Sequence, residues 1–126
     1  MNIRFITQKI HAFLDYPVAV SLMAMPFVLG LGESHPLAFW LSLVTGVAAL
    51  ILTLLTDHET GIVPVLPYSY HLAVDFSVGV LFTVAPLLIG FTGIDLIYYL
   101  ANAAAVLTVV GLHQPAKAST PVGAPA

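Results

Sequence analysis

The chain contains 126 residues, of which 60% are hydrophobic and only 7% are charged, and its formal net charge is −3. Because roughly a quarter of the residues in an average soluble domain are charged, this composition excludes an ordinary soluble domain and indicates a protein embedded in a bilayer. The sequence contains no cysteine, which excludes disulfides and thiolate ligands.

Four stretches have the length and composition of membrane-spanning helices. Their uncharged windows run 16–32, 36–56, 76–94 and 96–112. Each window is close to the ~20 residues that a helix needs to cross the ~30 Å hydrocarbon core of a bilayer. The sequence therefore predicts an all-α fold with transmembrane helices at about 11–31, 36–56, 68–91 and 94–112.

The segments outside these helices are polar or rich in Gly and Pro. Residues 1–10 form a polar N-terminal lead-in, residues 59–67 form a connecting loop, and residues 114–126 form a tail that we expect to be disordered. Between them lie two two-helix units, residues 11–58 and residues 68–113.

The two units repeat one another at an offset of 60 residues. Six positions are identical in the alignment of 11–30 with 71–90: His11/His71, Asp15/Asp75, Val18/Val78, Val20/Val80, Pro26/Pro86 and Gly30/Gly90. Such a match predicts two tandem two-helix repeats. Two helices return the chain to its starting side, so a pseudo-two-fold axis should run along the membrane normal. The repeat also argues against a cleaved signal peptide in the first stretch, since its counterpart lies mid-chain.

The basic residues indicate the orientation in the membrane. Arg4, Lys9 and Lys117 all fall on the side of the two termini, and the positive-inside rule places that side in the cytoplasm. We therefore predict a multi-pass protein of the cell inner (plasma) membrane, in contact with the lipid bilayer and with both termini cytoplasmic. No basic patch or Gly-rich phosphate loop supports a nucleic-acid or nucleotide partner.

Small and aromatic residues predict how the helices pack. Small side chains at four-residue spacing, Ser42/Gly46 and Ala101/Ala105, offer surfaces on which a second helix can approach closely. The tyrosine pair 98–99 matches an aromatic belt at the membrane–water interface, opposite the termini.

The polar residues gather on the side of the termini. His11 and Asp15 lie one helical turn apart, as do His71 and Asp75, so each pair shares a helix face. Four further groups fall on the same side of the membrane: Asp57, His58, Glu59 and His113. Imidazole and carboxylate groups are ligands of Zn²⁺, Fe²⁺ and Mn²⁺. The two pairs are therefore candidate ligands of a divalent transition metal, with the other four as additional ligands, and a haem between His11 and His71 is a weaker alternative.

A structural interpretation of the same residues is favoured over metal binding. A His/Asp pair near a helix start can pair with itself and with interfacial water, and Asp15 could cap a helix that begins at Pro17. Asp75 should lie about eight residues, or ~12 Å, inside its helix, where an unpaired carboxylate is costly. We therefore expect Asp75 to face the bundle, and expect Asp75→Leu to disturb assembly or stability more than Asp15→Leu.

Several phrases of the sequence also carry a family resemblance. They are HAFLDY at 11–16, LTDHE at 55–59 with Gly61 after it, HLAVD at 71–75, and two Pro-bearing stretches at 24–30 and 84–90. Together they resemble the SPW repeat family of small bacterial integral membrane proteins, named for a Ser-Pro-Trp motif of which only Pro26 and Pro86 are retained here. The resemblance spans about residues 10–113 and implies tandem two-helix units, with no settled activity to carry over. It also implies a site centred on His11, Asp15, Asp57, Glu59, His71 and Asp75 rather than on His58 or His113.

Three functions follow as alternatives, none of them with catalytic residues. The first is a non-enzymatic membrane component whose His/Asp cluster organises the helix bundle or a surface for a membrane-protein partner. The second is a metal-binding or redox membrane protein that uses the paired His/Asp residues. The third is a channel formed by a homo-oligomer, lined by the few hydroxyl and amide side chains of the helices.

Overall fold

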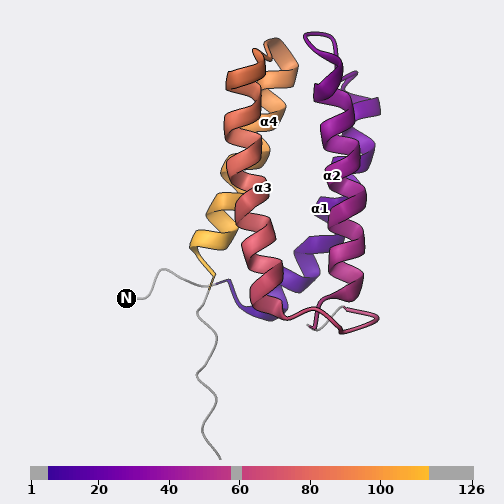
Figure 1. The fold of residues 1–126 in the computed structure, drawn as a ribbon, viewed down its shortest axis with the longest axis vertical. Coiled ribbons are helices and arrows are strands. Elements are labelled where there is room, and N and C mark those ends of the chain that lie inside the picture. Colours follow the sequence, from indigo (N-terminus) through magenta and orange to yellow (C-terminus); the bar gives the residue numbers. More distant parts are fainter. Residues whose placement is uncertain (1–5, 58–60, 114–126) are drawn as a thin grey trace, which may run out of the picture.

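A computed structural model shows an all-α protein, as predicted, and describes residues 6–57 and 61–113. Its four helices are drawn in Figure 1: α1 (Gln8–Val28), α2 (Pro36–Leu55), α3 (Tyr68–Ile89) and α4 (Gly93–Gly111). All four are long and apolar enough to cross a membrane. Their outward surfaces carry large apolar side chains such as Phe27 and Leu88, which are 67% and 81% exposed. The protein is therefore a multi-pass membrane protein in contact with lipid.

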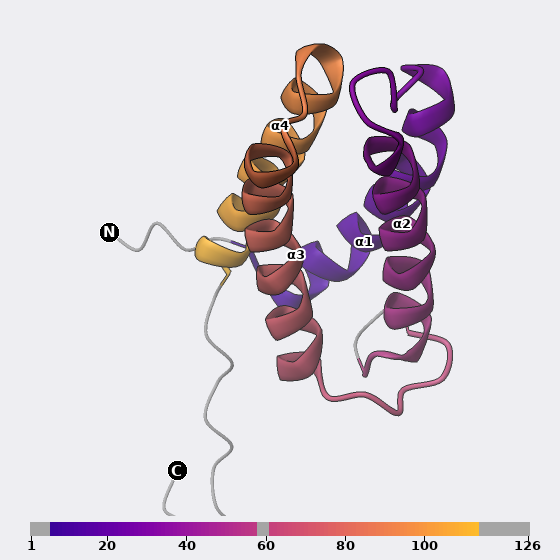
Figure 2. The same ribbon diagram turned by 45° about the horizontal axis from the view of Figure 1, so that its top comes forward.

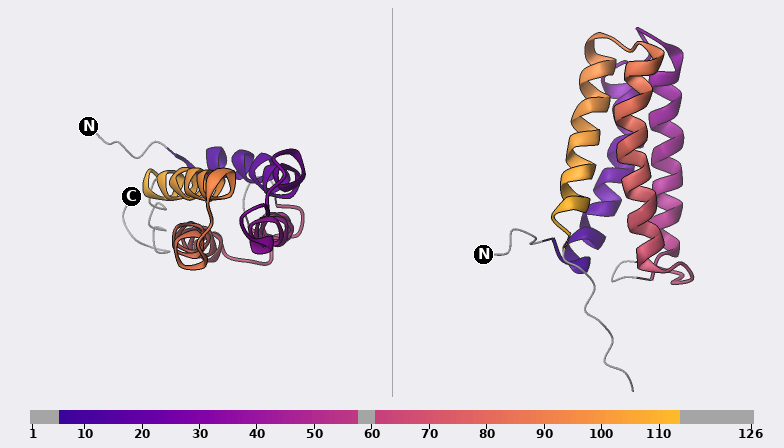
Figure 3. Two further views of the ribbon diagram at one scale, coloured as in Figure 1. Left: turned by 90° about the horizontal axis from the view of Figure 1, so that it is seen from above. Right: turned by 60° about the vertical axis from the view of Figure 1, so that its left-hand side comes forward.

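The helices form two antiparallel hairpins, α1 with α2 and α3 with α4, that stand side by side (Figures 1 and 3). The two ends of the described chain lie together at one end of the bundle, where the Ile6 N–H donates to the Leu112 carbonyl at 3.1 Å. The prediction that the chain returns to its starting side is thus confirmed for the described residues.

The first helix of each hairpin, α1 or α3, ends in the same way and at matching positions of the predicted repeat. Gly30 and Gly90 both adopt a positive φ, +62° and +87°, a conformation that glycine tolerates without a Cβ clash. The backbone N–H five residues after Pro26 and after Pro86 donates to the proline carbonyl, at 3.0 and 2.9 Å. These residues are the ones that recur at the 60-residue offset, and the duplication itself stays a prediction.

Helix α1 begins earlier than predicted and bends. The Thr7 hydroxyl accepts from the Ile10 N–H at 3.1 Å and caps the helix. Pro17 therefore lies inside α1, where it removes a backbone hydrogen bond, and the first half of the helix crosses toward the second hairpin (Figure 2). The interpretation of Asp15 as a helix N-cap is wrong, because the helix already starts at Gln8.

Close packing within the first hairpin depends on Gly46, as predicted. A Cβ at this position would lie 2.8 Å from the backbone nitrogen of Met23 and 3.0 Å from the Ala19 carbonyl oxygen. The neighbouring Ser42 hydroxyl donates to the Leu22 carbonyl at 2.8 Å. Small side chains on α2 thus let the α1 backbone approach closely.

In the second hairpin the close contact uses different residues from those predicted. Ala101 and Ala105 are exposed, so they do not form the close-approach surface. Instead, Gly79 of α3 leaves room for Leu107 of α4, whose Cδ2 would lie 2.5 Å from an added Cβ. The small-residue spacing identified the correct face of α2 but not that of α4.

The turns opposite the chain ends are joined by buried polar groups. Asp95 is fully buried and accepts from the N–H groups of Gly32 and Ser34, both at 2.9 Å, and from the Ser34 hydroxyl. The Tyr99 hydroxyl donates to the Ala38 carbonyl at 2.6 Å, and the Tyr98 hydroxyl lies 2.6 Å from Ser42 Oγ. The tyrosine pair is therefore buried between the hairpins and does not form the predicted interfacial belt.

Candidate functional site

Two histidines and two aspartates from α1 and α3 meet inside the bundle, toward the end that holds the chain ends. His11 and His71 are 3% and 1% exposed, and the side chains of Asp15 and Asp75 are 10% and 22% exposed. One potential ligand atom from each residue can be chosen so that all four lie within 4.8 Å of one another. The structure thus brings together the two pairs that the sequence placed on separate helices.

Each imidazole contacts both carboxylates. His11 Nε2 lies 3.1 Å from Asp15 Oδ1 and 2.7 Å from Asp75 Oδ2. His71 Nε2 lies 3.4 Å from Asp15 Oδ2 and 3.3 Å from Asp75 Oδ2. Two of these four contacts cross between the hairpins, so the cluster is also a polar junction that links α1 to α3.

The two aspartates lie at equal depth in their helices. Asp15 is seven residues after the start of α1 and Asp75 is seven residues after the start of α3, which is about 10 Å along each axis. The expectation that Asp75 is the more deeply placed carboxylate is therefore wrong. Its cause is the early start of α1 at Gln8, and Asp15 is in fact the less exposed of the two.

A hydrogen bond to the end of α2 fixes the orientation of His71. Its Nδ1 lies 2.8 Å from the Thr56 hydroxyl oxygen, and that hydroxyl donates its proton to the Leu52 carbonyl at 2.6 Å. Since the hydroxyl proton is used, Thr56 Oγ1 must accept, and His71 Nδ1 must carry the hydrogen. This arrangement directs His71 Nε2 toward the carboxylates and matches the way that metal-ligating histidines are held.

His11 is enclosed by aromatic rings. Its ring centroid is 5.5 Å from that of His71, 5.6 Å from that of His113 and 5.9 Å from that of Tyr68. The Tyr68 hydroxyl and His113 Nε2 are 2.7 Å apart. Nδ1 of His11 is buried and has no hydrogen-bond partner among the described residues. The rings therefore shield the cluster on its chain-end side.

Of the four additional predicted ligands, the two that the structure describes, Asp57 and His113, do not join this group of ligand atoms. His113 is buried beside His11, but its Nε2 pairs with Tyr68. Asp57 is exposed in the connecting loop, where its N–H donates to the Leu66 carbonyl at 2.8 Å. His58 and Glu59 lie outside the described residues.

Two contributors to the site were missed by the sequence analysis. Thr56 orients His71, and Tyr68 covers His11. Thr56 follows an apolar helix and directly precedes the polar segment at Asp57, so the sequence alone places it near the end of α2. Its contact with His71 could not be predicted, because it depends on how the loop after α2 folds back. Thr56 and Leu66 form a backbone bridge that creates this fold-back.

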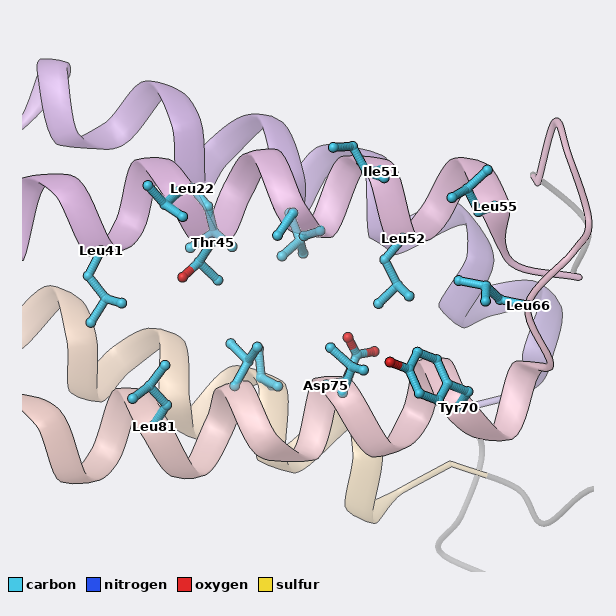
Figure 4. Close-up of a pocket in the computed structure, with 17 residues that line it drawn as sticks. Leu22, Leu41, Thr45, Ile51, Leu52, Leu55, Leu66, Tyr70, Asp75 and Leu81 are labelled. Atoms are coloured by element: carbon cyan, nitrogen blue, oxygen red, sulfur yellow. The ribbon is translucent and has the colours of Figure 1, made fainter.

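Cavities border the cluster on two sides. One, of about 280 Å³, lies between α1 and α4, and His11, Asp15 and Asp75 line it together with Asn102. Another, of about 640 Å³, lies between α2 and α3, and Asp75 reaches it as well (Figure 4). Asp75 is thus the member of the cluster that faces both cavities.

No family model, curated protein or solved structure matches this chain. The resemblance to the SPW repeat family stays a prediction.

Proposed function

We propose that this membrane protein binds a divalent transition-metal ion, Zn²⁺, Fe²⁺ or Mn²⁺, through His11, Asp15, His71 and Asp75. The bound ion would be held between the two hairpins, so that metal binding and organisation of the bundle are properties of the same cluster.

The spacing of the ligand atoms carries this proposal. Metal–ligand distances of 2.0–2.2 Å in a tetrahedral site place neighbouring ligand atoms about 3.3–3.6 Å apart. Three of the four imidazole–carboxylate separations are 3.1, 3.3 and 3.4 Å. These separations involve two imidazole nitrogens and three carboxylate oxygens, because the two oxygens of Asp15 face different imidazoles. One ligand atom from each residue can be chosen so that all four lie within 4.8 Å of one another, so the ligands must draw closer together to enclose an ion. A bare ion suits the cluster better than haem, since the carboxylates lie against both imidazoles.

The orientation and charge of the ligands support the same proposal. With Nδ1 protonated, a neutral His71 presents the Nε2 lone pair to two carboxylate oxygens, and two acceptors facing each other repel unless a cation lies between them. Two carboxylates and two neutral imidazoles carry a charge of −2, which one divalent ion neutralises. Neutrality matters here because a net charge within a membrane span is costly.

A structural His/Asp network is the second candidate, and one contact favours it. His11 Nε2 and Asp75 Oδ2 are 2.7 Å apart, which is the length of a charge-assisted hydrogen bond rather than the edge of a metal tetrahedron. In this arrangement protonated imidazoles neutralise the carboxylates, and the cluster links α1 and α3 without an ion. An organising role for the bundle, or for a membrane-protein partner, would then be its whole contribution.

The experiment that separates the two candidates is elemental analysis of the full chain. The protein is expressed in separate cultures supplemented with Zn²⁺, Fe²⁺ or Mn²⁺ and is then purified in detergent. We expect about one equivalent of a single transition metal. His71→Gln should remove it, whereas His35→Gln should retain it, because His35 caps α2 at the opposite end of the bundle. Less than about a tenth of an equivalent of every metal in the unmodified protein would overturn the proposal and leave the structural network.

We also propose that the protein lies in the cell inner (plasma) membrane with both termini in the cytoplasm. The common position of Ile6 and His113 at one end of the bundle supports a shared side, and the basic residues of both termini favour the cytoplasmic one. Cysteine accessibility labelling at Ser34, in the turn between α1 and α2, tests this: labelling from the cytoplasm would overturn the orientation. A homo-oligomeric channel stays a prediction of the sequence.

A further inference from the structure

A second feature of the bundle lies between the hairpins, and Asp75 is the one proposed metal ligand that lines it. This feature is the cavity of about 640 Å³ between α2 and α3, whose size is that of a small-molecule site. Its walls are mostly aliphatic and include Leu41, Val44, Ala48, Leu52, Val78 and Leu81. Because the chain is embedded in a bilayer, a molecule that enters this cavity must be soluble in lipid.

The cavity opens sideways from the bundle. Val44 and Ile51 of α2 are 61% and 52% exposed, and Tyr70 and Leu81 of α3 are 56% and 43% exposed, although all four line the cavity. Exposed side chains on both facing helices form a rim, so the cavity is continuous with the lipid around the protein. A ligand can therefore enter from the membrane without crossing either water-facing end.

The one carboxylate of the cavity lies nearer to one of its ends. Figure 4 shows Asp75 beside Tyr70, with Leu55 and Leu66 beyond them toward this end. Leu41 and Leu81 lie at the opposite end, and the Thr45 hydroxyl is the polar group nearer to it. In the described chain the contacts of Asp75 with the two imidazoles are made through Oδ2, and the side chain keeps 22% of its surface exposed. An ionised carboxylate is only an acceptor, so this end calls for a ligand group that donates a hydrogen bond.

The shape of the cavity fits a single extended hydrocarbon chain. Figure 4 places Leu52 opposite Asp75, and from Leu52 to Leu41 the lining of α2 runs about 16 Å at 1.5 Å per residue. A hexadecyl chain whose hydroxyl meets Asp75 fills this length, and its last few carbons reach past Leu41 into the surrounding lipid. The end near Asp75 lies nearer to the chain ends of the protein, so a ligand would be oriented like a lipid of that leaflet, with its head group outward and its tail toward the bilayer midplane.

We propose that this cavity binds a neutral, lipid-soluble alcohol, with its hydrocarbon body between α2 and α3 and its hydroxyl donating to the Asp75 carboxylate. Charge complementarity selects the hydroxyl head group. In both candidate states of the cluster, with a divalent ion or with two protonated imidazoles, the carboxylates of Asp15 and Asp75 are already neutralised, so a cationic head group would bring an unbalanced positive charge into the membrane span. An anionic head group would be repelled by the carboxylate.

The cavity is tested with three probes that share a hexadecyl chain: hexadecanol, hexadecane and hexadecanoic acid. Tritiated probes are incubated with the full chain in detergent after EDTA treatment, and retention is measured after gel filtration. We expect about one equivalent of hexadecanol, and binding at least about tenfold tighter than that of hexadecane, because the hydroxyl adds a hydrogen bond to a charged acceptor. Equal retention of hexadecanol and hexadecane would overturn the proposal, since the cavity would then hold any hydrocarbon chain without selecting a hydroxyl group.

A variant that fills the cavity provides the control. Ala48→Phe places a bulky ring among the lining residues at an exposed position, and should reduce hexadecanol retention about tenfold. Ala104→Phe makes the same substitution at an exposed position of α4 outside the described cavities and should leave retention unchanged. Retention that is equal in both variants would also refute the site. Because the EDTA-treated protein carries no ion, hexadecanol binding and metal binding can fail independently of one another.

Discussion

Replacing Thr56 by Val tests the metal site without touching a ligand. The substitution is close in volume but removes the acceptor of the His71 Nδ1–H, which lies 2.8 Å from Thr56 Oγ1. With a metal on Nε2, the hydrogen must stay on Nδ1 and would be buried without a partner, at a cost of about 1–3 kcal/mol. Without a metal, the hydrogen can move to Nε2 and bond to a carboxylate. The penalty therefore falls on the metal-bound state, and the affinity should drop about 10- to 100-fold.

The assay is a Zn²⁺ titration of the EDTA-treated protein in competition with a fluorescent chelator. Thr83→Val is the matched control, because its hydroxyl makes the same kind of bond, to the carbonyl four residues earlier, on α3. We expect the control to keep the Kd of the unmodified protein. An unchanged Kd for Thr56→Val, or an equal loss in both variants, would refute the role assigned to Thr56.

Four further predictions concern stability in detergent, measured as the thermal unfolding midpoint. Asp15→Leu and Asp75→Leu should each destabilise the protein by about 3–5 kcal/mol, because either one leaves buried groups of the cluster unpaired; a cost confined to Asp75 would contradict their equal depth. Gly46→Ala should cost about 1–3 kcal/mol through its clash with the α1 backbone, whereas Gly111→Ala, with open space around it, should be neutral or slightly stabilising. Asp95→Ala should cost roughly 2–4 kcal/mol as the turn loses its acceptor, and an unchanged midpoint would show that the turns are held by other contacts. Zn²⁺ at 100 times its Kd should stabilise the EDTA-treated protein by about 2.7 kcal/mol, and no shift would count against binding to the folded state.

Local sequence information was sufficient for the helices and for the pairing of the site residues. Apolar stretches of about 20 residues have few structural alternatives in a bilayer, so four spans could be located from composition alone. The i, i+4 spacing of His11/Asp15 and His71/Asp75 fixed which side chains share a face. Their recurrence at one offset then made it reasonable to expect convergence, and the structure shows it.

The parts that could not be predicted depend on contacts between distant segments. Asp95 binds Gly32 and Ser34, which are 63 and 61 residues away in the chain. No local pattern distinguishes this buried carboxylate from an exposed one. The hydroxyl of Tyr98 is satisfied by Ser42, which lies on another helix. Because that partner could not be identified from the local sequence, the sequence alone assigns the tyrosine to the membrane–water interface. Rules based on helix propensity and membrane depth describe one helix at a time. The hydrogen bonds of these side chains are made with residues of the other hairpin.

The distribution of cross-hairpin contacts explains why a metal ion at this cluster would matter to the whole bundle. Polar links between the hairpins occur at one end through Asp95 and at the other through the His/Asp cluster and Thr56. Between these ends lies the apolar cavity of about 640 Å³, where α2 and α3 do not fill the space. Lipid provides no hydrophobic drive to close such a gap. At the chain-end side the separation of the hairpins is therefore set by the cluster together with the Ile6–Leu112 backbone hydrogen bond. Whatever cation neutralises the two carboxylates contributes to that separation.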